Sequence, residues 1–202
     1  MGGQWDSGAM PGRGETYYSP TQTPDTSSSG ANLYGNEQIG KERWFDDVNP
    51  LTGNLRSNAQ VRCLLLRNDT GTTVYASQCV HIELGTYRSK FDRLSDVTAE
   101  GLVGIVDEWL PSGGCVANDS CWVVIQGPTL ALTSTSGGAL NVINQGDCIV
   151  AITAATSGAS DAGHVASGGT TSGVNIIGRA ESAATTSQTN SQILLYVGPT
   201  LR

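Results

Sequence analysis

Short apolar runs separated by turn residues constrain the fold of this chain more than any other feature of its sequence. From residue 60 onward such runs recur about every 10 to 20 residues, and Gly, Pro, Asn or Ser interrupts them, as in strands joined by tight turns. We expect strands at 60–67, 73–84, 102–110, 121–126, 129–133, 149–155, 174–180 and 192–197. About eight short strands predict an all-β domain, built as a small β-barrel or β-sandwich.

The composition supports strands and excludes several classes of protein. Gly, Ser and Thr make up 67 of the 202 residues, and only 14% of residues are charged, which disfavours amphipathic helices. The single helix candidate, 180–187, is short and rich in Thr, so we do not expect a helix there. A net charge of −7 argues against nucleic-acid partners. No apolar run has the ~20 residues of a membrane helix, so no membrane partner is expected.

The sequence divides into residues 1–58, an extended N-terminal arm with a transition segment, and residues 59–202, the β domain. Residues 1–40 carry Gly, Ser and three prolines but few aliphatic side chains, and they cannot bury enough apolar surface to fold alone. Aromatic side chains spaced along such a segment are typical of anchors that dock on another protein. The candidate anchors are Trp5, Tyr17, Tyr18 and Tyr34.

The transition segment, 41–58, adds two more candidate partner-binding residues. These are Trp44 and Phe45, and both side chains are expected to be buried. The run Thr52-Gly53-Asn54 predicts a turn. The pair Asp46-Asp47 lacks the loop spacing of a calcium site and is interpreted as a solvated acidic turn.

No catalytic constellation is evident, and the chain is not expected to be an enzyme or to hold a cofactor. His81 alternates with Val80 and Ile82 and is expected on the opposite face of its strand. His164 follows Asp161, but no G-x-S-x-G motif accompanies them. Adjacent strand residues point to opposite faces, so Asp107 and Glu108 are not expected to share a site.

The five cysteines are expected to be free thiols in a chain made in a reducing cytoplasm, because no secretory signal is recognisable. Cys115 and Cys121 could approach each other across a turn, which leaves a disulfide open as the alternative. No C-x-x-C pair is present, and the two histidines, His81 and His164, lie far in sequence from any pair of cysteines, so no metal site is expected.

The last hundred residues carry few charges and many small side chains. Trp109 and Trp122 lie in the two most apolar runs and are expected in the core. The stretch 157–173 is expected to be a long loop. Surfaces with little charge suit close contact between subunits, so the sequence favours a component of an assembly.

The stretch 61–198 resembles the small β domains of tailed-phage capsid decoration proteins, also called cement or head-stabilising proteins. The resemblance rests on VRCLLLRNDTG at 61–71, LVGIV at 102–106, CWVVIQGP at 121–128, NQGD at 144–147, IGRAE at 177–181 and ILLYV at 193–197. It implies a β-tulip-like domain on the outer capsid surface of a virion. Its implied partners are the major capsid protein and further copies of the same chain, as a homodimer or homotrimer.

A second hypothesis keeps the β domain but changes the partner. The chain would then be a head-fibre or tail-associated module that contacts carbohydrate of the host surface. Exposed aromatic side chains suited to stacking on sugars would distinguish this module from a capsid cement.

Overall fold

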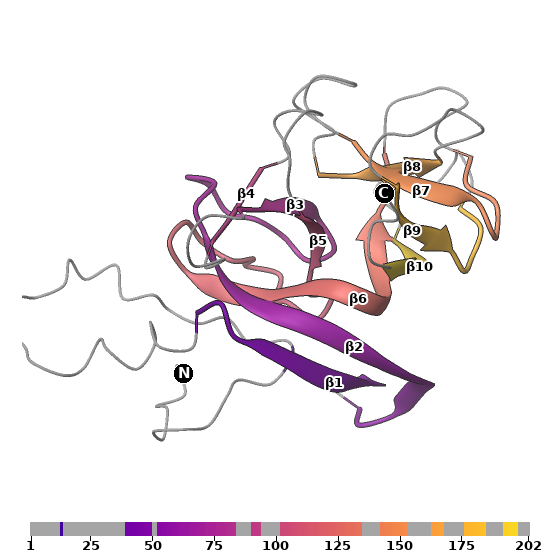
Figure 1. Cartoon of the computed structure of the whole chain (residues 1–202), viewed down its shortest axis with the longest axis horizontal. Coiled ribbons are helices and arrows are strands. Elements are labelled where there is room, and N and C mark those ends of the chain that lie inside the picture. Colours follow the sequence, from indigo (N-terminus) through magenta and orange to yellow (C-terminus); the bar gives the residue numbers. More distant parts are fainter. Residues whose placement is uncertain are drawn as a thin grey trace, which may run out of the picture.

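The computed structural model describes residue 13 and residues 39–49, 52–83, 90–93, 102–134, 142–152, 163–167, 176–184 and 192–197. Within these ranges it is built of strands and contains no helix, which confirms the all-β expectation (Figure 1). The strands are β1 (Glu42–Val48), β2 (Leu55–Asn68), β3 (Cys79–Ile82), β4 (Lys90–Asp92), β5 (Leu102–Val106), β6 (Ser120–Leu132), β7 (Cys148–Ala151), β8 (Val165–Ser167), β9 (Ile176–Ala180) and β10 (Gln192–Val197).

Five strands form a closed cycle of hydrogen-bonded pairs, in the order β2, β4, β3, β5, β6 and back to β2. Four of these pairings are antiparallel, and β2 with β4 is parallel. Alternate residues of the cycle point to one common core. Its members include Leu64, Leu66, Val80, Ile82, Phe91, Val106, Cys121 and Val123, all of which are buried.

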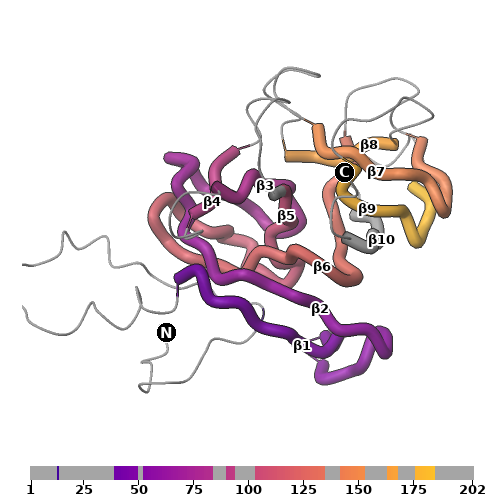
Figure 2. The backbone as a smooth tube through the Cα atoms, viewed as in Figure 1, coloured from indigo at the N-terminus to yellow at the C-terminus, as the bar shows by residue number. Residues whose placement is uncertain are grey.

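Whereas β1 pairs with β2, four further strands extend from the far half of β6. Its residues 127–132 pair with β10, and the order continues through β9 and β7 to β8. Figure 2 follows β6 from the closed cycle into this second group of strands. A second core joins the two groups, because Val103 and Ile105 of β5 cluster there with Ile149 of β7 and Ile177 of β9.

β6 is one continuous strand, and it contains both predicted segments, 121–126 and 129–133, except for Thr133. The strand passes from β2 to β10 at Gly127, whose backbone φ of +105° favours glycine. A Cβ atom there would lie 2.5 Å from the carbonyl oxygen of Gln60. The glycine and proline lie within the strand, which bends without ending there (Figure 1).

Three further strands lie where no strand was predicted. β1 forms in the transition segment and pairs with β2, so residues 42–48 and 55–58 belong to the sheet. β4 lies in the polar stretch after β3, and β8 lies within the predicted loop 157–173. Conversely, the predicted strand 73–84 is a strand only over β3. Short strands with polar or small side chains carry little periodic signal.

Candidate functional site

Three carboxylates and two guanidinium groups meet at one place beside the core, and we call them the ion-pair cluster. The carboxylates belong to Asp47, Asp107 and Glu108, and the guanidinium groups to Arg13 and Arg56. Each of the three acidic side chains is only 1% exposed. We refer to these three as the carboxylate trio. Charged groups this deeply buried require partners, because their desolvation is costly.

Arg13 reaches the carboxylate trio from far along the chain. Its Nε and Nη2 donate to Oδ1 of Asp107 at 3.1 and 2.8 Å, and Nη2 also donates to Oε1 of Glu108 at 3.3 Å. Nη1 lies 4.0 Å from Oδ1 of Asp47. The Arg13 side chain is 4% exposed, so this part of the N-terminal segment is fixed to the β domain.

Arg56 holds the other side of the cluster. Its Nε donates to both carboxylate oxygens of Asp47, at 3.0 and 3.1 Å. Its Nη1 and Nη2 donate to the two oxygens of Glu108, at 2.6 and 2.8 Å. The guanidinium also lies 5.9 Å from the ring centre of Trp109. Two such paired contacts fix the orientation of the planar group.

The fold explains how these side chains converge. Asp47 lies on β1 and is buried, whereas its neighbour Asp46 is exposed, as strand alternation requires. Asp107 and Glu108 follow the end of β5, in a turn closed by a hydrogen bond from Leu110 N to Asp107 O. The expectation that they point apart was wrong because alternation applies only within a strand. The expectation of a solvated turn was likewise wrong for Asp47.

The electrostatics of the cluster favour charged arginines. Burial opposes the charge on Arg13, but the carboxylates of Asp107 and Glu108 outweigh it and raise the pKa of the guanidinium. Burial likewise opposes the charge on Arg56, and Glu108 and Asp47 together raise its pKa. The arrangement therefore keeps both guanidinium groups charged and fixed against the three acidic side chains.

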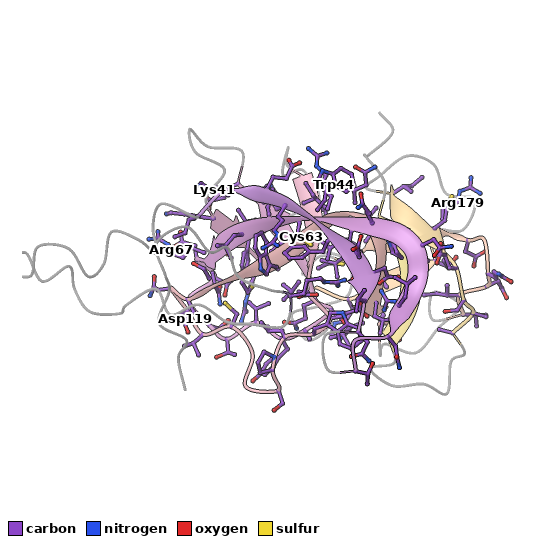
Figure 3. The ribbon with its side chains drawn as sticks, turned by 90° about the horizontal axis from the view of Figure 1, so that it is seen from below. Lys41, Trp44, Cys63, Arg67, Asp119 and Arg179 are labelled. Atoms are coloured by element: carbon purple, nitrogen blue, oxygen red, sulfur yellow. The ribbon has the colours of Figure 1, made fainter. Side chains whose placement is uncertain are left out.

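A second feature lies on the outward face of the β1–β2 hairpin, and we call it the Trp44 face. Its residues are Glu42, Trp44, Asp46, Gln60 and Arg62. Trp44 lies opposite Arg62 in the strand register, and the guanidinium of Arg62 is 5.7 Å from its ring centre. Arg62 also donates to Glu42 at 2.6 Å. In Figure 3, Trp44 lies at the margin of the molecule, and Cys63 lies inside it.

The predicted partner-binding residues fall into three groups. Trp44 is 48% exposed, so the expectation that it is buried was wrong: it alternates outward on β1. Phe45 is partly buried as expected and packs against Trp122 at a centroid distance of 5.0 Å. The aromatic residues of the arm lie outside the described residues, and they are Trp5, Tyr17, Tyr18 and Tyr34.

The two histidines lie apart from the ion-pair cluster. His81 is half-buried between the buried residues Val80 and Ile82, which confirms that it takes the opposite face. Its Nε2 atom is buried without a hydrogen-bond partner in the described part of the chain. His164 is buried, and its carbonyl accepts a hydrogen bond from Ile152 N. Asp161, its suggested partner, lies outside the described residues.

All five cysteines are free thiols in the structure, as expected. Cys115 and Cys121 approach each other closely enough for a thiol–thiol hydrogen bond, which with burial raises the pKa of Cys121. The described ranges contain no cluster of three His, Cys, Asp or Glu side chains that could ligate a metal. In the same ranges, no helix has the length and apolar character needed to cross a bilayer.

Sequence reasoning missed Arg13, although one signal was present. It is the only lysine or arginine among the first 40 residues, so a specific ionic contact was the natural role for it. Comparison with known proteins does not extend this picture, because neither a protein-family model nor a curated protein sequence matches the chain.

Proposed function

We propose that the chain is a structural virion protein that binds the outer surface of a tailed-phage capsid. There it would stabilise the shell by cementing neighbouring major capsid subunits. The resemblance of residues 61–198 to decoration proteins supports this proposal. The closed cycle of β2, β4, β3, β5 and β6 is consistent with a small β-barrel as the stiff body of such a protein.

The observation that carries the proposal is the exposure of Trp44 on a strand at the edge of the sheet. β1 stands at one end of the strand order and pairs only with β2 among the described strands. No other described strand pairs with its second edge, and the edge of a sheet can accept a partner strand through backbone hydrogen bonds. An exposed tryptophan beside such an edge is the residue type that dominates binding energy in protein interfaces.

The N-terminal arm would supply the remaining contacts. Trp5, Tyr17, Tyr18 and Tyr34 are proposed to dock on capsid subunits, and Phe45 is proposed to support Trp44 from within. Arg13 ties the arm to the domain between the first of these anchors and the second. Many copies on one shell would add weak contacts into a stable layer through effective concentration.

The test is co-sedimentation with expanded capsids that lack this protein. Wild-type protein should bind to saturation at a fixed ratio to the capsid subunit. Trp44→Ala should weaken binding at least tenfold, because an interface hot spot contributes ~2 kcal/mol or more. Tyr75→Ala is the matched control, since Tyr75 is also half exposed, at 51%, but belongs to the connection between β2 and β3 and not to the Trp44 face. Absence of saturable binding by the wild type would overturn the proposal.

The contribution of the arm needs a variant that keeps Arg13. Deleting the whole arm would remove a partner of buried carboxylates and confuse loss of folding with loss of binding. Replacing the four arm aromatics by serine leaves Arg13 in place. This variant should keep the wild-type melting temperature and lose capsid binding.

A carbohydrate-binding module is the second candidate, and the same tryptophan favours it. The ring of Trp44 is exposed beside polar side chains of Glu42 and Arg62, which suits stacking on a sugar with hydrogen bonds at its rim. A glycan array separates the two functions. Binding to host-surface polysaccharide, lost in Trp44→Ala, combined with no capsid binding would favour this module.

A further inference from the structure

The carboxylate trio is a built site for an arginine side chain, and its occupant comes from a distant part of the sequence. We propose that the trio also accepts Arg13 from a second copy of the chain, so that N-terminal segments link neighbouring subunits. The inference deepens the proposed homo-oligomer but does not depend on capsid binding, so it can be tested without capsids.

The trio requires a cation from outside the sheet. Asp47, Asp107 and Glu108 bring three acidic side chains together. β2 contributes one guanidinium group, that of Arg56, and the hydroxyl of Ser57, which donates to Asp47 at 2.7 Å. The hydrogen bonds of Arg56 go to Asp47 and Glu108, whereas Oδ1 of Asp107 accepts hydrogen bonds from Nε and Nη2 of Arg13. A guanidinium matches the oxygens of two carboxylates at once, which an ammonium group cannot do with the same geometry.

The covalent connection does not confine Arg13 to its own domain. Twenty-five residues, 14–38, separate Arg13 from Ile39, the next described residue. Such a length of chain spans at most about 85 Å. A 202-residue protein has a radius of gyration of only about 17 Å. The chain is therefore long enough to carry Arg13 to the trio of an adjacent copy.

The same contacts form whether Arg13 comes from its own chain or from a neighbour. The choice therefore depends on effective concentration, which changes only slowly with the length of the connecting chain. Copies held side by side in an oligomer present their arginines at a comparable concentration. Reciprocal exchange between two copies also closes on itself, which produces a dimer and not a fibre.

Mixing two full-length variants tests the inference. Arg13→Ala keeps the trio intact but lacks the arginine, whereas Asp107→Asn with Glu108→Gln keeps Arg13 but lacks the site. Native mass spectrometry of the mixture should show a one-to-one complex, and the melting temperature of Arg13→Ala should rise. As the matched control, the site-deficient variant is given Arg13→Ala as well, and it should form no complex with Arg13→Ala.

A second measurement covers the case in which a variant does not fold. Wild-type protein labelled with ¹⁵N is mixed with unlabelled wild type, and mixed oligomers should form. Substitution Arg13→Lys in both samples keeps the charge and should reduce the mixed species at least tenfold. A wild type that stays monomeric at every concentration would overturn the inference. So would mixed complexes that form equally well without Arg13.

Discussion

Arg13 and Asp107 lie 94 positions apart in the sequence, and two hydrogen bonds of 2.8 and 3.1 Å join their side chains in the interior. The contact fastens the N-terminal segment to the turn that follows β5. A buried pair of this kind is costly to break, because each partner loses the group that compensates for its desolvation.

Substitution Asp107→Asn should therefore destabilise the protein strongly. Loss of one buried charge leaves Arg13 without its main partner, and we expect the free energy of unfolding to fall by about 3–5 kcal/mol. Urea denaturation followed by tryptophan fluorescence measures the change. Arg62→Ala is the control, since its pair with Glu42 is exposed and worth at most about 1 kcal/mol. Equal effects of the two substitutions would contradict a buried cluster.

The two strand tryptophans should respond very differently to truncation. Trp122 is fully buried against Phe45, whereas Trp44 is half exposed. We expect Trp122→Ala to cost about 3–5 kcal/mol of stability through the cavity it leaves. Trp44→Ala should change stability by no more than about 0.5 kcal/mol. Thermal or urea unfolding distinguishes them, and a large effect at Trp44 would mean that the strand faces are wrongly assigned.

Gly127→Ala tests the bend in β6. The new methyl group would meet the Gln60 carbonyl oxygen at 2.5 Å, and the positive φ would strain any side chain. We expect a loss of about 1–3 kcal/mol in the free energy of unfolding. Gly113→Ala is the matched control, because a Cβ atom there meets nothing within 4 Å and should leave stability nearly unchanged. If both variants melt alike, β6 does not bend as described.

Alkaline pH should destabilise the fold through its buried thiols. Burial raises the pKa of Cys79 to about 12, whereas an unfolded thiol ionises near pH 8.5. Between these values the unfolded state binds fewer protons, so stability falls as pH rises, by up to about 1.4 kcal/mol per unit for this thiol. Urea titrations from about pH 7 to about pH 10 measure the slope.

Cys79→Ala should reduce that slope, whereas Gly113→Ala, which removes no thiol and adds a methyl group in open space, should leave it unchanged. A slope that is the same in both variants and in the wild type would show that Cys79 does not carry the effect.

The sequence reveals the strands of the core well and the charged contacts poorly. Residues 192–197 were predicted as a strand and form β10 over that range, because their apolar run is uninterrupted. β1 escaped prediction because four of its seven residues are charged, although Phe45 packs on the core. Asp107 and Glu108 were wrongly predicted to point to opposite faces of a strand, because β5 ends at Val106, one residue before Asp107. The role of Arg13 depends on tertiary proximity, which no local pattern encodes.

The position of β6 in both groups of strands has a consequence for how the chain folds. β6 pairs with β2, about 60 residues before it in the sequence, and with β10, about 60 residues after it. A long loop must close before either pairing can form. Chains dominated by such distant pairings fold over milliseconds to seconds. Neither group of strands can complete its hydrogen bonding before β6 is in place, so both groups depend on this one strand.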